Sequence, residues 1–270
     1  MINILISFLH NCLNKIVLFR YKKKFNDYRS AKIFCEKHTK NSYNNEILNK
    51  YRYEKFHYNK DLIPYTFNNS LFTLLESVSL FYFNKKRLPK ILDFGGMFAE
   101  NKMYLNNLYK ADFTYDVIET ESVCNLAKNL KHSNFYPEID KAYINPDHNY
   151  DLIFSSGTIQ YFEKPYEILA KIFSKKSLYV VFTRTNFSDD ENIYSAASYL
   201  SGHGSSEGHI KYNISENKKL ILVPNTQIKE SKMLEIAKTH GYKLLRSFNG
   251  ITGNHGANSY TKDLIFSFQL

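Results

Sequence analysis

Cysteine is scarce in this chain of 270 residues, and its positions argue against two kinds of structure. The three cysteines, Cys12, Cys35 and Cys124, form an odd set without paired spacing. A disulfide framework and a zinc knuckle both need suitably spaced pairs of cysteines, so the sequence predicts neither. Free cysteines are typical of a reducing compartment, and we therefore expect the protein in the cytoplasm.

Long apolar runs are also missing. No uncharged apolar stretch reaches the length of about 18 residues that a membrane-spanning helix needs, so none is predicted. Residues 1–19 are apolar, but no basic stretch precedes them and no small-residue cleavage site follows them. A secretory signal is therefore not expected.

Acidic residues are few in the first part of the chain. Residues 1–60 contain 13 Lys and Arg against 4 Asp and Glu, a net charge of +9, which leaves +1 of the total of +10 for residues 61–270. A nucleic-acid enzyme needs a basic face around its active site, so the nearly neutral body argues against a nucleic-acid partner. The basic cluster at 20–24 allows two interpretations. Either an amphipathic segment touches an anionic membrane surface, or a helix packed on the core exposes a basic face.

Three apolar segments each end in a turn and a polar residue. KILDFGG spans 90–96, YDVIET spans 115–120 and YDLIFSSGTIQYF spans 150–162. They alternate with helix-length segments, as do the strands of a parallel sheet covered by helices, because strands buried on both faces need nearly continuous apolar side chains. The pattern predicts an α/β fold with a Rossmann-like, mostly parallel sheet over 90–187.

The remaining elements follow from local patterns. Residues 1–60 are predicted to form a basic helical extension, in which Ser30 caps a helix that runs through Lys40. Residues 61–270 form the Rossmann-like domain, with a glycine-rich insert or lid at about 188–215. Further helices are expected at 62–86, 97–110, 163–174 and 228–240, and a terminal antiparallel hairpin is expected from YKLLRSF and DLIFSFQL.

The corner after the first predicted strand is the expected ligand site. Asp93, Gly95 and Gly96 lie there, where backbone N–H groups at the carboxyl end of a strand face outward. The second predicted strand ends at Glu119, 24 residues after Gly95. A carboxylate at that place accepts hydrogen bonds from both vicinal hydroxyls of a ribose. We therefore expect Glu119 to bind the ribose of a nucleoside cofactor.

Glycine is scarce, with ten residues in the chain, and a complete G-x-G-x-x-G pattern is absent. Met97 and Ala99 occupy positions where glycine would be expected. Close backbone approach to a pyrophosphate needs those glycines, so the turn suits a cofactor without one, such as S-adenosylmethionine. Asp93 and the turn backbone would hold its amino-acid end. A tight strand-to-helix turn without any ligand is the alternative.

The chain resembles class I S-adenosylmethionine-dependent methyltransferases, and more narrowly the methyltransferases encoded among genes for bacterial surface polysaccharides. The segments that carry the resemblance are FNDYRSAKIFCEK, SYNNEIL, ILDFGG, YDVIE, FSSGTIQYFEKPYEIL and VVFTRTNF. It implies that Asp93, Gly95 and Gly96 form the cofactor turn and that Glu119 is the ribose acid. Ala99 departs from the family, whose turn more often has glycine there. Ser156 and Gln160 complete the cofactor contacts that we predict.

Acceptor contacts are expected from the ends of the later strands. Tyr161 can hydrogen-bond an acceptor hydroxyl, as Gln160 also can, although both can instead pack against the methionine arm of the cofactor. Arg184 can grip a phosphate or carboxylate in fork geometry. The alternative for Arg184 is an ion pair with an acid in the segment 189–191.

Transfer of a methyl group to a hydroxyl needs one positioned base. His203 and His209 in the insert and His255 in a second glycine-flanked loop are the candidates, since an unperturbed imidazole titrates near neutral pH. Each of them can equally be a solvated loop residue. His203 and His209 are six residues apart with Glu207 as the nearby acid, which does not predict a metal site.

We predict a cytoplasmic S-adenosylmethionine-dependent O-methyltransferase that acts on a hydroxyl of a sugar, sugar nucleotide or glycan intermediate of a capsular or other surface polysaccharide. The expected partner is this small or glycan substrate, which can be phosphorylated or nucleotide-linked. Two alternatives stay open. One is a methyltransferase-like protein that has lost catalysis and binds partners in a glycan-assembly complex, and the other is an RNA methyltransferase.

Overall fold

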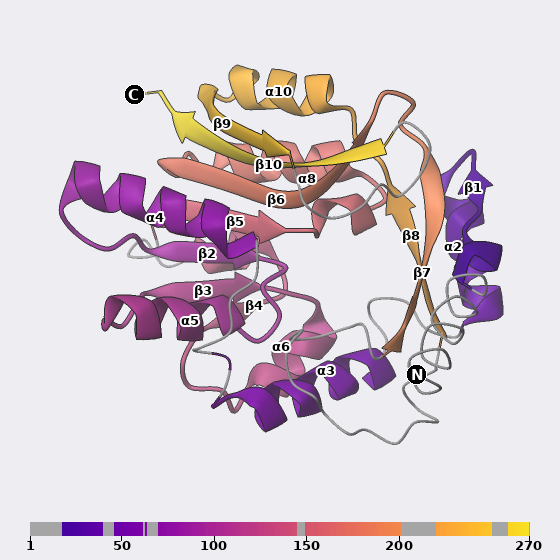
Figure 1. Cartoon of the computed structure of the whole chain (residues 1–270), viewed down its shortest axis with the longest axis horizontal. Coiled ribbons are helices and arrows are strands. Elements are labelled where there is room, and N and C mark those ends of the chain that lie inside the picture. The colour runs from indigo at the N-terminus through magenta and orange to yellow at the C-terminus, as the bar shows by residue number, and fades with distance from the viewer. Residues whose placement is uncertain are drawn as a thin grey trace, which may run out of the picture.

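The computed structural model describes residues 18–39, 46–61, 63, 70–144, 149–200, 220–249 and 259–269. Its central feature is a seven-stranded sheet with the order β4-β3-β2-β5-β6-β10-β9 (Figure 1). The strands are β4 (Phe135–Tyr136), β3 (Tyr115–Ile118), β2 (Ile91–Phe94), β5 (Leu152–Ser156), β6 (Tyr179–Ser188), β10 (Ser259–Phe268) and β9 (Tyr242–Asn249). The first five are parallel, and β10 runs antiparallel to both β6 and β9. This is the predicted Rossmann-like sheet with a terminal antiparallel hairpin.

Both faces of the sheet are covered by helices, which explains the continuous apolar runs in its strands. On one face, Leu92 and Phe94 of β2 pack in a core with helices α7 (Ile139–Ala142), α8 (Pro165–Ser174) and α10 (Glu230–Thr239). On the other face, Ile91 packs in a core with α4 (Ser70–Lys85) and α5 (Glu100–Tyr109). Successive residues of a strand point to opposite faces, so β2 contributes to both cores.

A second, three-stranded sheet has the order β1-β7-β8 and is antiparallel. Its strands are β1 (Lys24–Phe25), β7 (Ile193–Tyr199) and β8 (Leu220–Thr226), and α2 (Tyr28–His38) packs against it (Figure 1). Strand β1 comes from the N-terminal extension, whereas β7 and β8 follow β6 in the chain. The extension and the insert thus build one accessory layer together.

Helix α3 (Glu46–Asn59) joins this layer to the main sheet. Leu48 and Tyr51 pack in a cluster with residues of β8, while Phe56 packs in a cluster with Phe98 and with Val123 of α6 (Glu121–Ala127). Figure 1 shows α3 beside α6, reaching toward the ends of β7 and β8. The second half of the extension therefore lies against the region that follows strands β2 and β3.

The predicted helices at 97–110, 163–174 and 228–240 and the terminal hairpin are confirmed as α5, α8, α10, β9 and β10. The predicted helix at 62–86 is seen as α4, and residues 62 and 64–69 lie outside the described residues. Its described part is the half that covers the sheet.

One local prediction was wrong. Ser30 does not cap α2, because the helix begins at Tyr28 and the carboxylate of Asp27 accepts from the Ser30 N–H at 2.8 Å and from its hydroxyl. The predicted insert or lid at about 188–215 contains strand β7, which was not predicted, and the lid itself stays a prediction because residues 201–219 lie outside the described residues. Strand β8 was not predicted. Pro224 interrupts its apolar run, and proline is tolerated there because β8 is an edge strand.

No helix in the described part of the chain is both long and apolar enough to cross a membrane. Membrane contact through the N-terminal segment stays a prediction, because residues 1–17 lie outside the described residues. In the basic cluster that follows, Lys24 belongs to strand β1 and pairs with Tyr194 of β7. The cluster therefore borders the accessory sheet.

Candidate cofactor site

The turn that follows β2 requires glycine at two successive positions. The φ angle of Gly95 is +84°, and a Cβ atom added there would lie 2.8 Å from Cβ of Thr158. A Cβ atom added to Gly96 would lie 2.7 Å from Cβ of Asp93. Both neighbours are fixed by the backbone, so neither glycine accepts a side chain without movement of the turn. The Gly95 N–H donates to the carbonyl of Ile118 at 2.8 Å, which joins the turn to the end of β3.

Met97 and Ala99 adopt the left-handed conformation for which glycine is favoured, with φ angles of 52° and 62°. For a residue other than glycine, this conformation raises the free energy of the folded state by about 1 to 3 kcal/mol, so it persists only where the surrounding structure imposes it. These are the two positions at which the sequence lacks the glycines of a dinucleotide turn. The backbone of this turn therefore has the conformation of a glycine-rich turn, although its residues at these two positions are methionine and alanine.

Asp93 lies buried beneath this turn at the end of β2. Its carboxylate accepts hydrogen bonds from the Tyr115 hydroxyl and from Nδ2 of Asn101, the latter at 3.2 Å. Burial raises the pKa of Asp93 to about 7, against the lowering effect of the Tyr115 and Asn101 hydrogen bonds. The predicted cofactor acid is therefore fixed in position and titrates near neutral pH.

Glu119 follows β3, on the neighbouring strand. Its Oε1 accepts from the Met97 N–H at 3.3 Å, and its Oε2 accepts from the Thr120 N–H at 2.8 Å. Burial raises its pKa, and the two backbone N–H groups and Arg52 oppose that rise. The carboxylate is oriented by the turn itself, and each oxygen keeps a second lone pair with which it can accept from a ribose hydroxyl.

Ser156, Gln160 and Arg184 converge where β5 ends; Arg184 lies within β6, which continues to Ser188, and not at the end of that strand. The Ser156 hydroxyl oxygen accepts from Nε of Arg184 at 3.0 Å and from the Thr183 hydroxyl at 2.7 Å. Gln160, in the short helix η2 (Ile159–Tyr161), donates from Nε2 to the Arg184 carbonyl at 3.5 Å. Its Oε1 is buried and has no hydrogen-bond partner among the described residues. Gln160 therefore retains an acceptor for a ligand.

Arg184 is exposed and has a positive φ of 52°. None of the ion pairs found among the described residues joins it to the acids of 189–191, which had been its alternative partners. Its backbone N–H instead donates to Asp263 at 2.9 Å, and the other carboxylate oxygen accepts from Thr73 at 2.9 Å. Asp263 lies at a register irregularity of β10. The Asp263 carboxylate thus stabilises the strained backbone of Arg184, whose guanidinium lies beside Ser156.

Tyr161 lies at the same edge, and its predicted contact with an acceptor or cofactor stays a prediction. Its side chain is half-buried against the cluster that Leu48 and Val223 form with the accessory sheet, and its carbonyl accepts from the Tyr28 hydroxyl at 2.8 Å. It therefore also fastens the accessory layer to the main sheet.

Three charged residues of this region were not predicted. Arg52 and Lys55 lie on α3 and are buried, and Glu100 lies at the start of α5 with a buried Oε1 that has no described hydrogen-bond partner. Burial raises the pKa of Glu100 to about 7, and the positive charges of Arg52 and Lys55 oppose the rise. The sequence offered one signal, which is that Glu100 directly follows the glycine turn.

The predicted bases His203, His209 and His255 lie outside the described residues. They stay predictions. Within the described ranges, no group of three or more His, Cys, Asp and Glu side chains is arranged to hold a metal ion.

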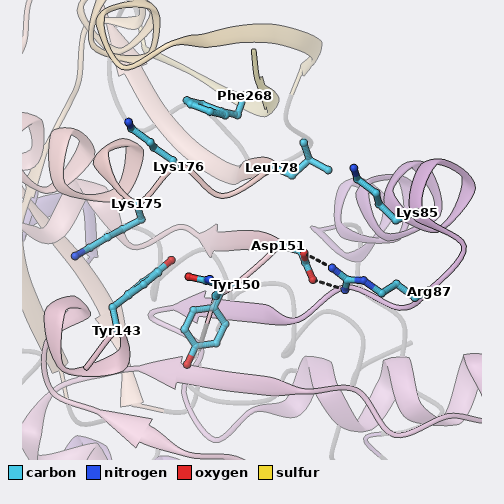
Figure 2. A pocket seen from close by; sticks show the side chains of 10 residues that line it. Lys85, Arg87, Tyr143, Tyr150, Asp151, Lys175, Lys176, Leu178 and Phe268 are labelled. Atoms are coloured by element: carbon cyan, nitrogen blue, oxygen red, sulfur yellow. Dashed lines mark hydrogen bonds and ion pairs between the residues drawn. The ribbon is translucent and has the colours of Figure 1, made fainter. Parts of the chain in front are cut away.

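A pocket of about 500 Å³ opens at the opposite edge of the sheet (Figure 2). Asp151, which precedes β5, forms a paired contact with the guanidinium of Arg87, with both N–O distances 2.7 Å. Lys175 and Leu178, which precede β6, also line the pocket. These residues stand at the amino ends of the strands, whereas a ligand of a doubly wound sheet binds at the carboxyl ends. The pocket is therefore not the candidate cofactor site.

No protein-family model and no curated protein sequence matches this chain. Solved structures do resemble it. One is an S-adenosylmethionine-dependent methyltransferase from Clostridium acetobutylicum, with 13% identity, a TM-score of 0.49, and coverage of 81% of this chain and 99% of that one. Another is the N-terminal domain of EvdMO1 with S-adenosylhomocysteine bound, with 11% identity, a TM-score of 0.43, and coverage of 72% and 80%.

A third is magnesium protoporphyrin IX methyltransferase from Synechocystis with S-adenosylmethionine bound, with 11% identity, a TM-score of 0.44, and coverage of 74% and 79%. At these identities and TM-scores, the fold assignment depends on the strand order of this chain. That order, with β10 antiparallel between β6 and β9, is the Rossmann-like arrangement that the sequence predicted.

The two carboxyl groups with a pKa near 7 make a testable prediction about stability. Asp93 and Glu100 bind protons more tightly in the folded protein than at their ordinary pKa values of 3.8 and 4.5. The stability that they contribute is full below about pH 4 and is lost as the pH rises through 7. We expect the melting temperature of the ligand-free protein to fall less between pH 5 and 8 in Asp93→Asn and Glu100→Gln than in the wild type. The exposed Glu121→Gln is the control, and equal slopes in all four proteins would contradict the prediction.

Proposed function

We propose that this chain is an S-adenosylmethionine-dependent O-methyltransferase whose acceptor is a hydroxyl of a sugar, sugar nucleotide or glycan intermediate in surface-polysaccharide synthesis. The main support for this cofactor is the turn after β2, which is hydrogen-bonded to the end of β3. There, Gly95 and Gly96 leave no room for side chains, and Glu119 is oriented by the N–H of Met97. A nucleoside ribose placed against Glu119 brings the remainder of the cofactor along the turn, over Asp93.

The residues of the chain would bind and orient the cofactor and the acceptor. Bound S-adenosylmethionine would supply an electrophilic methyl group on its sulfonium sulfur. Glu119 would accept from the ribose hydroxyls, and Gln160 would offer its buried Oε1 to the ligand. Holding the acceptor in line with the methyl group accounts for a large share of the rate of such a reaction.

The acceptor side is proposed from Arg184 and from the resemblance in sequence. The guanidinium of Arg184 stands exposed next to Ser156, at the carboxyl edge of the sheet. Its fork of N–H donors suits the phosphate of a sugar nucleotide or of a phosphorylated sugar. One of His203, His209 and His255 would take the proton of the acceptor hydroxyl.

Titration calorimetry of the purified chain tests the cofactor. We expect micromolar binding of S-adenosylmethionine and S-adenosylhomocysteine and none of NAD, whose pyrophosphate needs glycines that this turn lacks. Transfer of the labelled methyl group to a panel of sugar nucleotides and glycan fragments then tests the acceptor. Absence of binding to both S-adenosyl compounds would refute the enzyme and favour a non-catalytic binding protein.

A further inference from the structure

Helix α3 buries a polar face, although it belongs to the basic extension. Asn49, Arg52 and Lys55 are only 0%, 6% and 5% exposed. Lys and Arg are rarely buried to this extent unless they meet opposite charges, because an unpaired buried cation is costly. On the same helix, Lys50 is exposed and forms only a surface pair with Glu54 at 4.0 Å. The burial of Arg52 and Lys55 is therefore specific to one face.

That face is directed at the cofactor site. Arg52 interacts electrostatically with both Glu100 and Glu119, and Lys55 does so with Glu100. The helix is fastened to the cofactor turn through aromatic rings, because the ring centroids of Tyr53 and Phe56 lie 5.3 and 5.5 Å from that of Phe98. Phe98 stands inside the turn itself. The register of α3 relative to the turn is thus set by packing.

Two buried hydrogen-bonding atoms of opposite kind in this region, a donor on α3 and an acceptor at the start of α5, lack a partner among the described residues. Nδ2 of Asn49 is a buried donor without a partner among the described residues, while Oδ1 of the same side chain accepts from Nη1 of Arg52 at 3.5 Å. Oε1 of Glu100 is a buried acceptor that likewise has no described partner. Buried groups of this kind are rare and call for an explanation, of which a ligand is one. A ligand with an anionic acceptor and a cationic donor would satisfy both.

We propose that α3 is the subsite for the amino-acid end of the cofactor. Arg52 and Asn49 bind the α-carboxylate, Glu100 accepts from the α-ammonium group, and Lys55 balances the charge of Glu100. This inference depends on the proposed function, since it specifies how the same cofactor is held. It assigns to the N-terminal extension a part of the active site and not a separate surface role.

The test compares ligands with and without an amino-acid end. Methylthioadenosine has the adenosine and the sulfur but no amino-acid end, whereas S-adenosylhomocysteine has that end without a sulfonium charge. In Arg52→Gln, we expect at least tenfold weaker binding of S-adenosylmethionine and S-adenosylhomocysteine, and unchanged binding of methylthioadenosine, by calorimetry. Arg52→Lys should recover part of the loss, because it keeps the charge without the fork. The surface variant Lys50→Gln should behave as the wild type.

A second variant covers the case in which Arg52→Gln does not fold. Asn49→Asp keeps the acceptor for Arg52 and replaces the Nδ2 donor by an oxygen, so it should also weaken the two S-adenosyl ligands selectively. Equal weakening of all three ligands, or no weakening of any, would overturn the subsite. If the wild type binds none of the three ligands, the proposed function itself fails, which is a distinct result.

Discussion

Replacing Gly96 by alanine is expected to abolish measurable cofactor binding and to destabilise the fold. The new Cβ atom would lie 2.7 Å from Cβ of Asp93, whose carboxylate is buried and held by Tyr115 and Asn101. Overpacking of this kind typically costs about 1 to 3 kcal/mol. Because Asp93 must move, the turn over which the cofactor would lie moves with it. Chemical denaturation and calorimetry with S-adenosylmethionine measure the two effects.

Gly157→Ala is the matched control. Its φ is +61°, but a Cβ atom added there would come no closer than 3.6 Å to Arg184, so it adds backbone strain without overlap. We expect a loss of about 1 kcal/mol of stability and retention of cofactor binding. If Gly96→Ala has the affinity and stability of the wild type, the predicted overlap between the added Cβ atom and Asp93 is wrong.

The Glu119→Ala variant is expected to bind S-adenosylmethionine about 10- to 100-fold more weakly. The carboxylate would lose its hydrogen bonds with the ribose, and hydrogen bonds to a charged group contribute about 1.5 to 3 kcal/mol. It would also release the N–H of Met97, which loosens the turn. Glu121→Ala, two residues later and exposed, should leave the affinity unchanged. If both variants bind S-adenosylmethionine as tightly as the wild type, Glu119 does not bind the cofactor.

Much of the candidate site follows from where polar residues stand relative to apolar runs. Asp93 and Glu119 come at the ends of the neighbouring parallel strands β2 and β3, so these positions bring them to a common edge. Arg184 reaches this edge from within β6, beside Ser156 at the end of β5. Apolar runs are strong signals because strands buried on both faces need them. The sequence could not show that Met97 and Ala99 adopt the conformations that glycine would otherwise supply. Backbone strain depends on tertiary packing.

The role of the extension was not predictable in the same way. Its charges predict a solvated surface, and the helix that carries Arg52 has no clear apolar stripe. Only the packing of Tyr53 and Phe56 on Phe98 turns its polar face toward Glu100. Likewise, strand β7 acquires its partners from segments far along the chain, namely β1 and β8. Its short, weakly apolar sequence therefore contained little local signal.

The sequence by itself determined the Rossmann-like sheet, its antiparallel ending and the places of two glycines and two acids at the ends of β2 and β3, because each depends on local periodicity or on spacing along the chain. The tertiary structure decided that the extension and the insert share a sheet, that Arg184 is held by Asp263, and that helix α3 packs against Phe98 in the turn after β2. These features are contacts between segments distant in sequence. No local pattern encodes them, since their free energy arises only when burial brings the partners together.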